Sequence, residues 1–282
     1  MTRTRLLAAL VMTPLVIAAI LFLSTPWLAV LAAVLFLGGL WEWLRLAEVE
    51  DTLARTVLLV LNLLLMVAMV WASRTASGGS LALFQVATVI GVAWWLLATL
   101  WLRAYDFGSD HDNRARGTKL AAGTFAVVPA WCAVVLIHAQ RPHGQWWLLL
   151  ALLLVWAADT GAYFAGRRFG GRMFTRKLAP RISPNKTIEG MLGGLLLSLA
   201  IALAGAQLIG VEAGQLPAVA VAAVATVLFS VVGDLFESLL KRHAGVKDSG
   251  DLIPGHGGLL DRMDSVLAAL PVFALAKEWL GF

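Results

Sequence analysis

Residues 238–264 read SLLKRHAGVKDSGDLIPGHGGLLDRMD and connect two apolar segments, near 217–240 and 263–281. The stretch is rich in glycine and in charged side chains, although 60% of the chain is hydrophobic. Carboxylates mixed with lysine and arginine over a glycine-rich loop are the groups that a Mg²⁺-bound polyphosphate requires. A solvated loop at the cytoplasmic ends of two spans would explain the cations. It would not explain Asp234 and Glu237 inside the preceding apolar segment, so the stretch predicts a phosphate site at a membrane surface.

The composition excludes a soluble globular domain, because the mean hydropathy is +0.83 and 14% of the residues are charged. Nine apolar runs are long enough to cross a bilayer. They lie near 6–24, 27–44, 56–73, 80–102, 119–138, 146–165, 188–210, 217–240 and 263–281. The first run lacks a clear cleavage site for a signal peptide, so we expect a retained helix. The sequence therefore predicts an all-α integral membrane protein, a polytopic bundle of about nine transmembrane helices.

The basic residues are distributed unevenly around these runs. If the N-terminus and every second connection are cytoplasmic, 19 of the 22 Lys and Arg residues lie inside, and Arg74, Arg141 and Lys277 lie outside. The positive-inside rule then predicts an N-in, C-out protein of the inner membrane, with loops 166–187 and 241–262 in the cytoplasm. The net charge of +5 follows from this topology. We expect no nucleic-acid binding, because no soluble basic domain is present to carry it.

Polar residues that could carry chemistry concentrate in the second part of the chain. We therefore expect N-terminal spans at 1–118, about four helices without a recognisable motif, and a catalytic region at 119–282 with about five helices. Cys132 is the single cysteine and lies in an apolar run, which excludes disulfides within the chain and cysteine metal sites.

Acidic residues lie inside two of the predicted spans. Asp159 lies eight residues before Arg167, and Asp234 lies eight residues before Arg242. Both carboxylates should therefore be roughly 12 Å from the cytoplasmic ends of their helices, a depth that would allow one shared cavity. An acid at this depth is by default a functional-site hypothesis, with a structural ion pair as the alternative. The spacing i, i+3, i+4 and i+7 gives four residues of the second helix a common face: Asp234, Glu237, Ser238 and Lys241.

Asp261 and Asp264 lie at the predicted start of the last helix. Asp261 would suit the N-cap, and Asp264 would interact favourably with the helix dipole. A metal site is the other interpretation, because Mg²⁺ is usually held by one or two carboxylates with substrate phosphates and waters. We expect Asp234 and Asp261 to hold Mg²⁺, and Asp159 and Asp264 to support this ion or to hold a second cation.

The loop 166–187 contains seven basic residues interleaved with apolar ones. Such a mixture suits an anionic membrane interface, although the positive-inside rule would equally explain the charges. Ser183-Pro184 predicts a helix start, which would direct backbone N–H groups and Lys186 towards a phosphate. His256 is either a general acid or a hydrogen-bonding residue of the glycine-rich turn, and we do not assign it a catalytic role.

These residues carry a resemblance to a known family. The stretch 238–264 resembles the signature of CDP-diacylglycerol synthases (phosphatidate cytidylyltransferases), through Ser238, Lys241-Arg242, Lys247-Asp248, Pro254, His256-Gly257-Gly258 and Asp261-Arg262-Met263-Asp264. The blocks DTGAYF at 159–164, followed by Gly166-Arg167, and SPNKTIEG at 183–190 are similar to the family as well. The resemblance covers about residues 155–282. Asn185 departs from it, since lysine is expected there about as often, and this leaves Lys186 as the one cation of that turn.

The resemblance implies that CTP and phosphatidate react at the cytoplasmic face of the bilayer to give CDP-diacylglycerol and pyrophosphate, in phospholipid biosynthesis. It implies Mg²⁺, with room for a second cation, and in-line attack by the lipid phosphate on the α-phosphorus of CTP. No protein nucleophile is required, so catalysis would rest on positioning and charge. The residues expected to act on the reacting groups are Asp234, Asp261, Lys186, Lys241 and Arg242. Those expected to contact substrate are Asp159, Asn185, Glu237, Ser238, Lys247, Asp248, His256, Gly257, Gly258, Arg262 and Asp264.

Two rival functions use similar parts. A CTP-dependent lipid kinase would attack the γ-phosphorus and release CDP. A secondary transporter could also have acids within its spans, but it should show paired broken helices in two halves. The concentration of polar residues in the C-terminal part disfavours the transporter. A homodimer is one assembly that the sequence leaves open.

Overall fold

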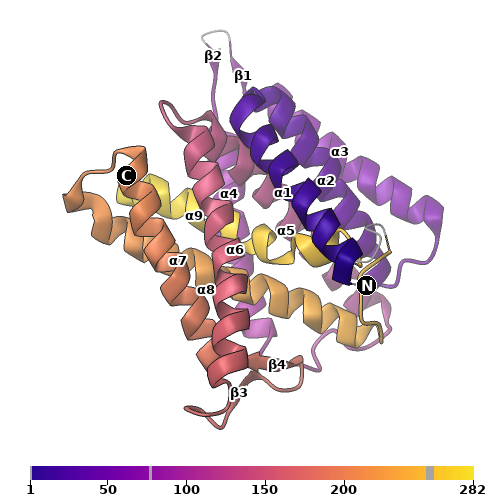
Figure 1. Cartoon of the computed structure of the whole chain (residues 1–282). Coiled ribbons are helices and arrows are strands. Elements are labelled where there is room, and N and C mark those ends of the chain that lie inside the picture. Colours follow the sequence, from indigo (N-terminus) through magenta and orange to yellow (C-terminus); the bar gives the residue numbers. More distant parts are fainter. Residues whose placement is uncertain (1, 76–77, 252–256) are drawn as a thin grey trace.

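The computed structural model describes residues 2–75, 78–251 and 257–282. These residues form nine α-helices, two 3₁₀ turns and two small antiparallel hairpins (Figure 1). The helices are α1 (Thr2–Phe22), α2 (Thr25–Leu46), α3 (Thr52–Ala72), α4 (Ala82–Trp101), α5 (Asn113–Ala139), α6 (Gly144–Phe169), α7 (Ile188–Ile209), α8 (Leu216–His243) and α9 (Asp264–Leu280). The remaining elements are β1 (Arg74–Thr75), β2 (Gly78–Gly79), β3 (Lys177–Ala179), β4 (Ser183–Thr187), η1 (Ala213–Gln215) and η2 (Leu260–Arg262).

Each predicted apolar run corresponds to one of these helices, which confirms the all-α polytopic architecture. Within the described ranges, seven helices are long and apolar enough to cross a membrane. The two others are shorter: the apolar part of α1 is Leu10–Phe22, and α9 has 17 residues.

The core of the bundle lies around α5, which packs against α2, α4, α6 and α9 (Figure 1). Its side chains from Ala126 to Ile137 are almost all buried, Cys132 among them. The outermost helices have the opposite pattern: Leu61, Leu64 and Trp71 of α3 are exposed. Exposed apolar side chains along a whole helix suit a lipid environment, because lipid tails are as apolar as these side chains.

Glycines bring α6 and α7 into backbone contact. A Cβ on Gly194 would lie 2.4 Å from the carbonyl oxygen of Ala158, and one on Gly161 would lie 2.7 Å from that of Gly193. No side chain could fit between the two helices here. The close packing of small residues is a usual way for membrane helices to associate.

The second important contact is between α8 and α9. A Cβ on Gly233 would lie 2.3 Å from the carbonyl oxygen of Asp264, so the start of α9 rests directly on α8. Phe236, fully buried, fixes the opposite side of α8 through rings at centroid distances of 5.2 Å from Trp101 and 5.8 Å from Trp43. This packing orients the face that carries Asp234.

Two local predictions are wrong. Ser183-Pro184 does not begin a helix, because residues 183–187 pair with β3 in a hairpin. The helix begins at Ile188, and the Thr187 side chain caps it by accepting a hydrogen bond from Gly190 N (3.0 Å). Asp261 is not the N-cap of the last helix: it lies in η2, and α9 begins at Asp264.

Candidate functional site

A cavity of about 720 Å³ opens between α6, β4, α7 and α8. It brings together the 159–167 and 183–190 blocks and Asp234 of α8, although they are far apart in the chain; none of the described residues of 238–264 lines it. Its polar lining residues are Asp159, Tyr163 and Arg167 from α6, Ser183, Asn185, Lys186 and Thr187 from β4, Ser230 and Asp234 from α8, and Ser265 from α9. The close contact of α6 with α7 forms one wall, where Gly190 and Gly194 leave the space open.

Asp234 and Lys186 form an ion pair in this cavity. Their side chains are 30% and 26% exposed, so the pair is accessible from the cavity. The other carboxylate oxygen of Asp234 accepts a longer hydrogen bond from Ser238 Oγ (3.4 Å). Asp159 and Asp264 both lie within electrostatic range of Asp234 and Lys186. Asp159 and Asp234 line the same cavity, as their predicted equal depth in the two helices suggested.

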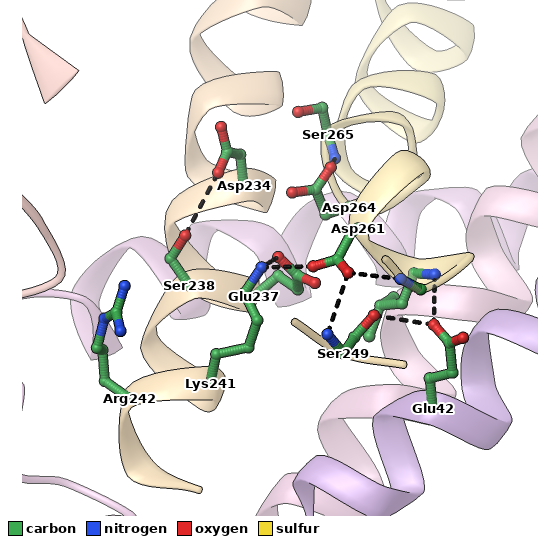
Figure 2. A network of polar contacts seen from close by, with 12 residues as sticks. Glu42, Asp234, Glu237, Ser238, Lys241, Arg242, Ser249, Asp261, Asp264 and Ser265 are labelled. Atoms are coloured by element: carbon green, nitrogen blue, oxygen red, sulfur yellow. Dashed lines mark hydrogen bonds and ion pairs between the residues drawn. The ribbon is translucent and has the colours of Figure 1, made fainter. Parts of the chain in front are cut away.

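A second cluster lies one helical turn further along α8, where Lys241 binds two carboxylates (Figure 2). Its Nζ is 2.5 Å from Glu237 Oε2 and 2.6 Å from Asp261 Oδ1. All three side chains are nearly buried, at 12%, 2% and 11% exposed respectively. Asp261 Oδ2 accepts two backbone hydrogen bonds, from Ser249 N (3.1 Å) and Gly258 N (2.8 Å).

Asp261 is held as an anion by these contacts. Burial acts to raise its pKa, but hydrogen bonds with Glu237, Lys241 and Gly258 outweigh this and lower the pKa to about 2. Lys241 Nζ donates to Oδ1, and Ser249 N and Gly258 N donate to Oδ2, so both oxygens of Asp261 are engaged within the protein.

The expected metal ligands Asp234 and Asp261 thus belong to two neighbouring clusters, each with its own lysine. Across the part of the chain that the structure describes, no three Asp, Glu, His or Cys side chains form a site that could hold a metal by themselves. The donors nevertheless fit Mg²⁺, which takes one or two carboxylates and completes its shell with phosphates and waters.

Other predicted residues occupy varied places. Arg242 donates from Nε to the carbonyl oxygen of Ile182 (3.2 Å) and so ties α8 to the turn between β3 and β4. Lys247 and Asp248 are exposed. Arg262 lines a separate apolar cavity between α1, α2, α6 and α9, yet is also within electrostatic range of Asp159.

The glycine-rich turn is described in part, since His256 lies outside the described residues. Gly257 has a φ of +81°, in the left-handed region that favours glycine. The neighbouring Gly258 supplies the N–H bonded to Asp261.

Sequence reasoning missed Glu42, Ser249 and Glu189. Glu42 of α2 is buried and accepts hydrogen bonds from the 249–260 segment (Figure 2). Glu189 of α7 accepts hydrogen bonds from Met173 N and Phe174 N, which ties the basic loop to the helix. Glu42 carried a signal: it is an acid within an apolar run, the criterion that drew attention to Asp234.

Comparison with known proteins gives this geometry a family. Residues 3–280 match the model of the Cytidylyltransferase family. The chain belongs to that family. The resemblance seen over about 155–282 therefore extends over the N-terminal helices as well, and the chain is a nucleotidyltransferase of the membrane.

Individual relatives agree with this assignment. The chain is 39% identical over 274 residues to a phosphatidate cytidylyltransferase of Pseudomonas aeruginosa, which covers 97% of this chain and 96% of the relative. It is 37% identical over 289 residues to a protein of the same name from Haemophilus influenzae, covering 97% and 98%. A phosphatidate cytidylyltransferase of Staphylococcus aureus (strain COL) is 46% identical over 135 residues, about half of each chain.

Proposed function

We propose that this protein is a phosphatidate cytidylyltransferase, which converts CTP and phosphatidate to CDP-diacylglycerol and pyrophosphate. The observation that carries the proposal is the cavity in which Asp159, Lys186 and Asp234 meet. It joins two blocks of the family resemblance, 159–167 and 183–190, with Asp234 of α8, between helices that can span a bilayer. A soluble nucleotide and a membrane-bound lipid require a site at such a boundary. Family membership and the names of the relatives support a transferase over a transporter.

The reaction is a single displacement at the α-phosphorus of CTP. An oxygen of the lipid phosphate forms the new P–O bond, the bond from the α-phosphorus to the bridging oxygen of the β-phosphate breaks, and that oxygen leaves with pyrophosphate. The nucleophile is already an anion, so no general base is needed. Lys186 and Lys241 would stabilise the phosphate charge, and the carboxylates that now pair with them would orient both ammonium groups.

Asp234 and Asp261 would hold Mg²⁺, and Asp159 and Asp264 would support it or hold a second cation. When bound, Mg²⁺ would supply charge neutralisation at the phosphates. The partial exposure of Asp234 to the cavity supports its part in this assignment, and the place of Asp261 in the stretch that resembles the family signature supports the other.

The protein is proposed to lie in the inner (cytoplasmic) membrane, with the site facing the cytoplasm. The support is the distribution of basic residues. Loop 166–187, which contains the β3–β4 hairpin, and loop 241–262 together carry 11 of the 22 Lys and Arg residues.

The deciding experiment is turnover by the purified full chain in detergent with CTP, Mg²⁺ and phosphatidate, followed by identification of the phosphorus-containing products. CDP-diacylglycerol and pyrophosphate in equal amounts are expected, and none of either after chelation of Mg²⁺. Release of CDP with a newly phosphorylated lipid would instead show the kinase. No turnover of phosphatidate, with the protein folded, would refute the proposal.

A further inference from the structure

Glu42 is a buried carboxylate, 3% exposed, on a helix of the N-terminal spans. Its two oxygens accept three hydrogen bonds. Oε1 accepts from Leu259 N (3.0 Å), and Oε2 accepts from Ser249 Oγ (2.9 Å) and Leu260 N (2.8 Å). All three donors are uncharged. A buried carboxylate is costly unless it is hydrogen-bonded, so this arrangement fixes the segment that supplies the donors.

Two glycines of the same segment lie directly against this carboxylate. A Cβ on Gly250 would lie 2.3 Å from Glu42 Oε1, and a Cβ on Gly258 would lie 2.3 Å from Glu42 Oε2. Any larger residue at either position would displace the Glu42 side chain. The absence of side chains at 250 and 258 is thus a requirement of the contact with α2.

Asp261 binds the same two parts of the chain, Ser249 and the residues around Gly258, from the other side. It accepts from Ser249 N and Gly258 N, while Glu42 accepts from Ser249 Oγ and from the two residues after Gly258. We call Ser249 and Gly258 the neck of the 249–258 loop. The neck is held between two carboxylates, one from α2 and one from η2, and its amides in turn fix the carboxylate of Asp261.

We infer that Glu42 is a positioning residue for the reaction: through the neck it sets the orientation of Asp261, and with it the ammonium of Lys241. The inference rests on the proposed function, in which Asp261 and Lys241 act on metal and phosphate. It gives the N-terminal spans a part in catalysis, since α2 supplies the carboxylate. Loss of partners that orient a metal ligand typically costs about 10–100-fold in activity or metal affinity.

The test is Glu42→Gln in the full chain. Glutamine keeps the size but replaces one acceptor oxygen with an NH₂ group, which would face a donor of the neck. We expect kcat to fall about 10–100-fold and the Mg²⁺ concentration for half-maximal rate to rise, with the KM for phosphatidate nearly unchanged. Glu278→Gln is the matched control: Glu278 is exposed and accepts from Gln85 Nε2, and its variant should resemble the wild type.

A second readout does not depend on activity. Amide hydrogen exchange of a peptide over 245–250 reports Ser249 N, which donates to Asp261 and not to Glu42. Faster exchange of this peptide in Glu42→Gln, with α5 unchanged, would show that Glu42 orders the contact of Asp261. If the wild type does not convert phosphatidate, the proposed function fails while this readout still decides the contact.

Normal kcat, normal Mg²⁺ dependence and unchanged exchange in Glu42→Gln would overturn the inference. Should that variant fail to fold, Ser249→Ala decides, because it removes one donor and leaves α2 intact. It should change kcat and exchange in the same direction by a smaller factor. Wild-type values in both measurements would then refute the role of Glu42.

Discussion

Replacing Lys241 with methionine should destabilise the protein strongly, in addition to stopping turnover. Methionine keeps most of the apolar stem and removes the ammonium group. Two nearly buried carboxylates, Glu237 and Asp261, would lose the cation that lies 2.5 and 2.6 Å from them. Removing one partner of a buried ion pair costs about 3–5 kcal/mol, because the remaining charge is left buried and uncompensated. For a chain of 282 residues, an unfolding entropy of about 2.1 cal/mol/K per residue converts this to a fall in melting temperature of roughly 5–8 °C.

Lys186→Met is the matched control, since Lys186 also pairs with an aspartate. Its pair with Asp234 is about a quarter to a third exposed, so its loss should cost only about 0–1 kcal/mol. Both variants should be inactive, and they should differ in stability. Melting followed by tryptophan fluorescence in detergent, with size-exclusion chromatography as a check on folding, measures this difference.

A double variant tests the cause. Lys241→Met combined with Glu237→Gln removes one of the two carboxylates left without a partner, so it should recover part of the lost stability. Equal melting temperatures for Lys241→Met and Lys186→Met would refute the argument from burial. A double variant less stable than Lys241→Met would show that Glu237 stabilises the fold by another route.

Further expectations concern the charge, the reaction course and the topology. Asp234→Asn should insert and fold but not turn over; near-normal activity at ordinary Mg²⁺ would exclude it as a metal ligand. Chiral α-phosphorothioate CTP should give inversion at phosphorus, whereas net retention would indicate a covalent intermediate. In a Cys132→Ser background, a cysteine at 143 should be labelled from outside the cell and one at 247 should not; the reverse pattern would overturn the orientation. The lowered pKa of Asp261 means that its stabilising contribution is complete above about pH 4 and is lost as the pH falls towards about 2; a melting-temperature difference between wild type and Asp261→Asn that already shrinks at pH 6 would contradict this.

The fold followed closely from the sequence because each span is set by length and hydropathy, which are local properties. The shared cavity of Asp159 and Asp234 could also be anticipated, since helix geometry converts residue spacing into depth. The start at Ser183 failed because the local signal for a helix start cannot show that residues 183–187 pair with β3. The cap at Asp261 failed for a similar reason: its carboxylate turns towards amides of Ser249 and Gly258. Glu42 was missed because its donors are more than 200 residues away.

The pairing of each lysine with a carboxylate has a consequence for how ligands bind. In the free protein, each lysine is neutralised by the carboxylate beside it: Lys186 by Asp234 and Lys241 by Asp261. A phosphate that attracts either ammonium group competes with its carboxylate, and that carboxylate then becomes an anion in need of a cation. Nucleotide and metal should therefore bind cooperatively. Thermodynamic linkage requires the effect to be reciprocal, so CTP should strengthen Mg²⁺ binding by the same factor by which Mg²⁺ strengthens the binding of CTP.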